Sequence, residues 1–125
     1  MPHKDGSAYH PIVCTVSLGS SLCLDIYRNN DDGTIERSPK WKILQEPRSL
    51  LITTDELYLD YLHGIEETTE DINLGQETVS NWDLLRSTDM IINGRLERQK
   101  RTSLTFRDVL KVVKLSSKFP MLGKR

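Results

Sequence analysis

The sequence predicts a mainly β fold, a double-stranded β-helix of the jelly-roll or cupin-like barrel type, in a single domain of residues 1–125. Three observations indicate this class: several short segments alternate in the period of a strand, turn residues separate them, and few stretches have helical spacing. Many short strands joined by turns are typical of antiparallel jelly rolls and barrels.

The front of the chain predicts four strands. Apolar residues alternate along 12–18 and again along 22–27, and the Gly-Ser-Ser link between these segments predicts a hairpin. A loop rich in Asn, Asp and Gly follows from residue 29 and continues to about residue 40. Two further strands are predicted at 41–44 and 49–53, with a bend at Glu46-Pro47 between them.

The period changes at residues 54–56, where Thr-Asp-Glu resembles the N-terminus of a helix. Apolar residues at 57, 58, 61 and 62 then recur at helical spacing, so the helix is predicted to end near His63-Gly64.

A long polar insert at about 66–100 is predicted to be the least ordered part of the domain. Within it, Trp82, Leu84 and Leu85 predict a short element that docks on the core. A strand is predicted at 101–107, and the strand character is expected to continue through 109–115.

Charge is distributed unevenly, although the net charge is only −1. Residues 1–94 carry 7 basic and 16 acidic side chains, a net of −9, whereas residues 95–125 carry 10 basic and 2 acidic, a net of +8. A basic end is compatible with a phosphate-bearing partner, and equally with neutralising the acidic front of the same chain.

The two cysteines, Cys14 and Cys23, are too few for a disulfide framework, and both are predicted to be small buried apolar side chains. No apolar run reaches the 18 residues typical of a membrane helix, and the first residues do not resemble a secretory signal. We therefore expect no membrane partner and an intracellular location, in the cytoplasm, the nucleus or both.

Three histidine and aspartate side chains could hold a metal ion. His3 and Asp5 are two residues apart, a spacing that puts both side chains on one face of an extended segment. A distant histidine such as His63 would complete two imidazoles and one carboxylate, the facial triad of non-haem iron(II) sites. The alternatives are a solvated His-x-Asp near the terminus and a structural histidine at the end of a helix.

Arg101 and Arg107 lie on one face of the predicted strand together with Ser103 and Thr105. The opposite face carries Thr, Leu and Phe and is predicted to pack in the core. Two arginines inside a small barrel would be costly without anions, so they could bracket a small dicarboxylate with bidentate contacts. The alternative is an edge strand with both arginines in water.

Taken in order, these motifs closely resemble the AlkB-like iron/2-oxoglutarate dioxygenases. The resemblance rests on His3-x-Asp5, His63-Gly64-Ile65 and the Arg-x5-Arg of residues 101–107, and it extends to the surrounding residues. The flanking segments 9–11, 16–20 and 46–51 look most like the branch called AlkB homologue six.

The resemblance implies a role for each of these residues. His3, Asp5 and His63 would be the iron(II) ligands, Arg101 would pair with the far carboxylate of 2-oxoglutarate, and Arg107 would lie near its metal-chelating end. The implied reaction uses O2, releases succinate and carbon dioxide, and hydroxylates an N-methyl group that leaves as formaldehyde. The implied substrates are alkylated bases of DNA or RNA, flipped out or single-stranded.

One departure from the family pattern is the absence of any Asn-x-Tyr, which the family uses to hold 2-oxoglutarate on a strand before the His-x-Asp. We therefore expect a shortened domain that is incomplete at its N-terminal side, with His3 and Asp5 on a segment that no preceding strand holds in place. Two alternatives stay open: a non-catalytic barrel remnant that acts as a protein-interaction or regulatory module, and a cupin-like binder of small molecules with a structural metal.

Overall fold

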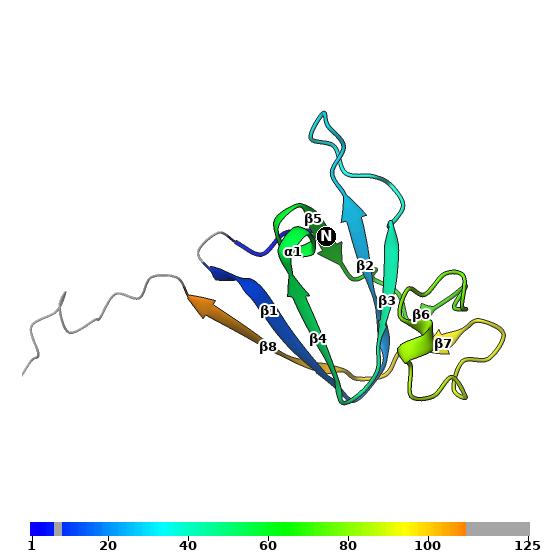
Figure 1. The fold of residues 1–125 in the computed structure, drawn as a ribbon. Coiled ribbons are helices and arrows are strands. Elements are labelled where there is room, and N and C mark those ends of the chain that lie inside the picture. The colour runs from blue at the N-terminus through cyan, green and yellow to red at the C-terminus, as the bar shows by residue number, and fades with distance from the viewer. Residues whose placement is uncertain (7–8, 110–125) are drawn as a thin grey trace, which may run out of the picture.

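The computed structural model describes residues 1–6 and 9–109, and within them the fold is mainly β (Figure 1). Two three-stranded antiparallel sheets, ordered β4-β1-β8 and β3-β2-β5, give a jelly-roll-like arrangement, and the described residues form no closed barrel. The elements are β1 (Tyr9–Leu18), β2 (Leu22–Arg28), β3 (Trp41–Gln45), β4 (Ser49–Thr54), α1 (Asp55–Leu59), β5 (Tyr61–Gly64), β6 (Glu70–Asp71), η1 (Trp82–Leu84), β7 (Leu96–Glu97) and β8 (Thr102–Val109). The strands predicted at 12–18, 22–27, 41–44, 49–53 and 101–107 are confirmed, and the continuation predicted beyond residue 109 lies outside the described residues.

The predicted hairpin of the first two strands is wrong, because β1 and β2 belong to different sheets. β1 pairs with β4 and β8, and β2 pairs with β3 and β5, so neither strand has an edge left for the other. The link starts at Gly19, whose φ of 90° lies in the left-handed region that favours glycine. A Cβ on Gly19 would also collide with the backbone oxygen of Lys100. The Gly-Ser-Ser link therefore carries the chain from one sheet to the other.

The predicted helix is also shorter than expected, because α1 ends at Leu59 and His63 lies on β5 instead of at a helix terminus. The apolar residues at 58, 61 and 62 are compatible with one long helix. They are equally compatible with a short helix that is followed by a strand. Pairing with β2, in which Ile26 lies opposite His63, selects the strand.

The polar face of β8 points inward and its apolar face points outward. A cavity between the sheets is lined by Ser103, Thr105 and Arg107 of β8 and by Arg101, which directly precedes the strand. The face predicted to pack in the core is outside: Leu104 is 46% exposed and Phe106 is 59% exposed. That prediction is wrong because the polar face of β8, and not its apolar face, lines the space between the sheets.

The main apolar cluster lies on the other sheet, where the insert covers its outer face. Leu74 and Val79 of the insert are buried against Cys23 of β2 and Leu44 of β3. Trp82 and Leu85 pack against this cluster, which confirms docking for these two residues, whereas Leu84 is exposed. The expectation of an insert without much order is wrong, because its apolar residues cover β2. Covered on both sides, β2 is buried from Leu22 to Ile26.

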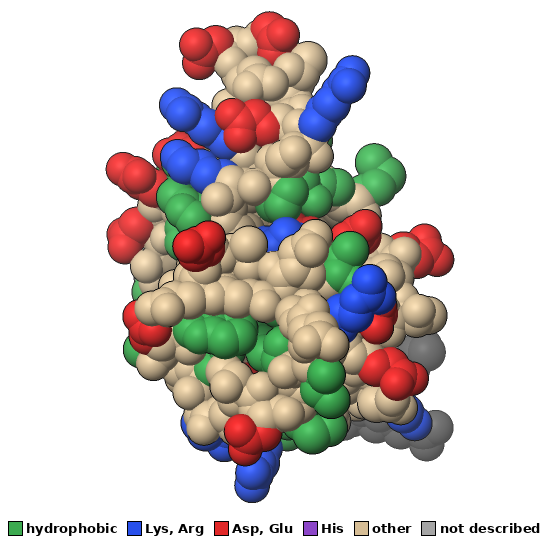
Figure 2. Space-filling model, turned by 90° about the vertical axis from the view of Figure 1, so that its right-hand side faces the viewer, with side chains coloured by type: hydrophobic (Ala, Val, Ile, Leu, Met, Phe, Trp, Pro, Cys, Tyr) green, Lys and Arg blue, Asp and Glu red, His purple; other side chains and the backbone are tan. Residues whose placement is uncertain are grey.

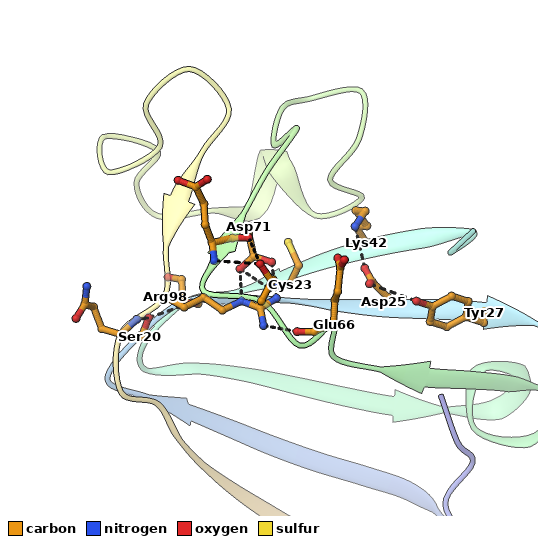
Figure 3. A network of polar contacts seen from close by, with 12 residues as sticks. Ser20, Cys23, Asp25, Tyr27, Lys42, Glu66, Asp71 and Arg98 are labelled. Carbon is orange, nitrogen blue, oxygen red and sulfur yellow. Dashed lines mark hydrogen bonds and ion pairs between the residues drawn. The ribbon is translucent and has the colours of Figure 1, made fainter. Parts of the chain in front are cut away.

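A buried ion pair between two residues of the insert, Asp71 and Arg98, lies next to β2 (Figure 3). Arg98 donates from Nε and Nη2 to the two carboxylate oxygens of Asp71 at 2.8 and 2.6 Å, and from Nη1 to the Glu66 carbonyl. Asp71 in turn accepts from the backbone N–H of Cys23. Burial, and then the charge of Asp71, raises the pKa of Cys23 to about 12. Both cysteines are free; Cys23 is buried as predicted and Cys14 is half-buried.

The surface on the insert's side of the molecule has no large patch of one charge. Acidic and basic side chains are interspersed over this face (Figure 2). Among the described residues, no helix is long and apolar enough to cross a membrane.

Candidate metal centre and anion site

The predicted metal ligands converge in the cavity between the two sheets. This cavity has a volume of about 340 Å³ and lies against β1, β2, β5 and β8. One nitrogen of His3, one nitrogen of His63 and one carboxylate oxygen of Asp5 all lie within 4.8 Å of one another. His63 is 60 positions from His3 and 58 from Asp5, so the fold has to bring it to the other two.

Backbone pairing brings His3 to His63. Each residue donates its N–H to the carbonyl of the other at 2.9 Å, an isolated antiparallel bridge on the free edge of β5. Gly64 permits this approach, because a Cβ there would lie 3.1 Å from the Cα of Pro2. The hydroxyl of Tyr58 also donates to the Gly6 carbonyl. The expectation that the first residues lack an anchor is therefore wrong: β5 and α1 hold them.

The surroundings of the two imidazoles prepare each of them differently for a metal. Burial, and then the neighbouring His3, lowers the pKa of His63, which favours the uncharged ring that metals bind. The His3 Nδ1 lies 3.0 Å from the Met1 carbonyl, which only accepts, so Nδ1 carries the proton and Nε2 is left for a metal. The two rings are 4.4 Å apart between centroids.

Arg107 orients the carboxylate of the group. It donates from Nε at 3.1 Å and from Nη2 at 2.9 Å to one oxygen of Asp5. The Asp5 side chain is only 11% exposed, so the guanidinium compensates a carboxylate that has little water around it. The structure thus places Arg107 beside the metal group, in contact with one of its candidate ligands.

Arg101 enters the cavity at the other end of β8 and has no acidic partner among the described residues. Its Nη2 donates to Ser17 Oγ and Gln45 Oε1, both at 2.8 Å, and its Nε is buried without a hydrogen-bond acceptor. Burial, and then the charge of Arg98, lowers the pKa of Arg101. A half-buried guanidinium whose Nε has no acceptor is suited to an anion.

These observations test whether iron(II) and 2-oxoglutarate would fit this pocket. Two imidazoles and one carboxylate within reach of one ion are the donor set of non-haem iron(II) sites with open positions. Arg101 offers an unsatisfied donor in the same cavity for a carboxylate group. The residues present fit both groups.

No protein-family model matches the chain. A curated zebrafish (Danio rerio) protein named "Probable RNA/DNA demethylase ALKBH6" is 37% identical over 131 residues, in an alignment that covers 100% of the chain. The chain is an AlkB-like homologue. A second relative of this AlkB-like chain, "Uncharacterized protein L905" of Acanthamoeba polyphaga mimivirus, is 30% identical over 111 residues, or 88% of the chain. The chain spans about half the length of these relatives, 53% of the first and 42% of the second.

Two polar residues of the AlkB-like pocket were not predicted as site residues: Ser17 and Gln45, which hold Arg101. For Ser17 the one sequence signal was the alternation of side chains along β1. It places Ser17 on the same face as Val13 and Thr15, two residues that line the cavity. Gln45 carries no signal, because it comes from the other sheet and meets Ser17 only in the folded chain, at 3.0 Å.

Proposed function

We propose that this chain is the iron(II)- and 2-oxoglutarate-binding part of an AlkB-type dioxygenase that demethylates alkylated DNA or RNA in the cytoplasm, the nucleus or both. The observation that carries the proposal is the meeting of His3, Asp5 and His63 in one cavity with the unsatisfied guanidinium of Arg101. The name of the zebrafish relative, a probable RNA/DNA demethylase, supports nucleic acid as the substrate class.

Each of these residues has a separate task in the proposal. His3, Asp5 and His63 would hold iron(II), and Arg101 would bind the far carboxylate of 2-oxoglutarate, with Ser17 and Gln45 keeping the guanidinium in place. Arg107 would fix the orientation of Asp5 beside the chelating end of the cosubstrate. When bound, iron(II) and 2-oxoglutarate together supply the oxidation of an N-methyl group by O2.

Metal titration tests the centre directly. Manganese(II), which does not react with oxygen as iron(II) does, should bind at one site in the 125-residue chain, measured by calorimetry. His63→Ala should abolish binding, because only His3 and Asp5 remain as ligands. His10→Ala, which removes the third histidine of the sequence, is the matched control and should bind as the parent does. Equal binding by His63→Ala would refute the triad.

The reaction is tested in a form extended to the length of the relatives. With iron(II), ascorbate, 2-oxoglutarate and a methylated single-stranded oligonucleotide, we expect succinate and formaldehyde in equal amounts. His63→Ala should release neither product. Manganese binding without any turnover in the extended form would favour the second candidate function, a metal-binding remnant that acts as an interaction module.

A further inference from the structure

A second, smaller groove opens beside the metal pocket. It has a volume of about 300 Å³, which is at the lower end of small-molecule sites. Ile26, Ile43 and Leu57 form its apolar lining, and Ile26 and Leu57 also line the metal pocket. The two spaces are therefore adjacent, with the same two side chains between them.

Two aromatic side chains form one wall of this groove. Trp41 at the start of β3 and Tyr61 at the start of β5 flank β2 from both sides, opposite Ile26 and Arg28 respectively. Their rings are 5.2 Å apart between centroids and tilted by 44°. Tyr61 is two residues from His63 on the same face of β5, or roughly 7 Å along the strand. A ring stacked here would lie next to the metal centre.

An exposed lysine lies over both rings. The ammonium of Lys40 is 4.6 Å from the centroid of Trp41 and 5.6 Å from that of Tyr61, and it donates to the Tyr61 hydroxyl at 3.5 Å. Trp41 remains 36% exposed beneath it. A long, exposed lysine can rotate away from the rings without disturbing the fold.

We propose that Trp41 and Tyr61 are a stacking site for an unpaired nucleobase next to the reacting nucleotide, and that Lys40 moves from the rings to the adjoining phosphate. This inference rests on the proposed function and specifies its substrate as single-stranded, since the bases of a duplex are already stacked on one another. Aromatic platforms with a neighbouring cation are how proteins bind single strands without reading their sequence.

The charges around the groove favour a nucleobase over a methylated lysine side chain, another ligand that aromatic sites bind. Lys40 already supplies the cation for both rings, so a methylated lysine side chain would meet its repulsion. Glu56 and Ser80 are the polar groups of the lining. A carboxylate repels phosphate but accepts from the exocyclic amine of a base, so the base should face Glu56 and the backbone should face Lys40.

The test uses the two tryptophans of the chain as matched reporters. In Trp82→Phe only Trp41 emits, and a short unmethylated single-stranded oligonucleotide should quench it. In Trp41→Phe the remaining Trp82, which belongs to the insert and packs against its apolar cluster, should not respond. By anisotropy of a labelled oligonucleotide, Trp41→Ala should weaken binding roughly 5- to 150-fold, and Tyr61→Phe should keep most of it. Leu84→Ala, at an exposed apolar residue of the insert, should change nothing.

Several outcomes would overturn the stacking site. These are an unquenched Trp41, an affinity of Trp41→Ala equal to that of the parent, or quenching by a trimethyllysine peptide in place of the oligonucleotide. Binding of a blunt-ended duplex of the same sequence as tightly as the single strand would overturn it as well. Manganese titration separates this inference from the proposed function, because Trp41→Ala should bind the metal as the parent does. Quenching of Trp41 without any manganese binding would support the stacking site and refute the proposed dioxygenase function.

Discussion

Arg101 is the residue on which 2-oxoglutarate binding depends in the proposal. Arg101→Lys should weaken 2-oxoglutarate binding by about 2–5 kcal/mol, because an ammonium can replace the contacts to Ser17 and Gln45 but cannot present the second donor of the fork. Calorimetry with manganese-loaded protein measures the loss. Arg95→Lys, an exposed arginine paired with Glu70, is the control and should bind normally. Undiminished affinity in Arg101→Lys would place the cosubstrate elsewhere.

The two cysteines should differ sharply in reactivity. Burial raises the pKa of Cys23 to about 12, so at pH 8 only on the order of one molecule in ten thousand carries the thiolate that alkylating reagents attack. Cys14 is half-buried on the opposite sheet. Iodoacetamide labelling of the folded protein followed by peptide mass spectrometry should modify Cys14 and spare Cys23 until urea is added. Early labelling of Cys23 would mean that the insert does not cover β2.

At the scale of elements, the ion pair of Asp71 and Arg98 joins the two ends of the insert, and Asp71 accepts a hydrogen bond from β2. Arg98→Met should lower the free energy of unfolding by about 3–5 kcal/mol, because it leaves the Asp71 carboxylate buried without its partner. Arg95→Met breaks the exposed pair with Glu70 and should cost at most about 1 kcal/mol. Urea denaturation of both variants measures the difference. Similar losses would show that the buried pair stabilises the fold no more than the exposed pair does.

Strands whose apolar pattern fits only one kind of element were predicted correctly. The segments that connect one element to the next were not. β4 and β8 follow from their alternation alone, to within a residue or two. The hairpin and the long helix were wrong because a glycine turn and apolar residues at 58, 61 and 62 each fit two structures. In both cases pairing with a distant strand made the choice.

At the scale of the whole molecule, the outer face of the β4-β1-β8 sheet is a large apolar surface. Leu50 and Ile52 of β4 and Leu104 and Phe106 of β8 are each 46–59% exposed and flank the central strand β1. Contiguous apolar surface of this kind binds hydrophobic dyes and promotes association. The 125-residue chain should therefore enhance the fluorescence of anilinonaphthalene sulfonate.

Two lysine substitutions on that face, Ile52→Lys and Phe106→Lys, should reduce dye binding and raise solubility while leaving the circular dichroism spectrum unchanged. Leu84→Lys, at an isolated apolar residue that is 82% exposed, serves as the control and should leave dye binding as it is. Dye binding that Leu84→Lys abolished would locate the apolar surface on the insert instead.

The sequence by itself determined the mainly β class, most strand positions and five of the residues that meet in the pocket, because alternation and residue chemistry are local properties. These five are His3, Asp5, His63, Arg101 and Arg107. It also carried the resemblance that the zebrafish relative confirms. Only the tertiary structure decided which strands pair, that β5 holds His3 against His63, and that Ser17 and Gln45 secure Arg101. These are contacts between residues up to 84 positions apart, and which of many possible partners a strand edge or guanidinium meets depends on how the whole chain packs.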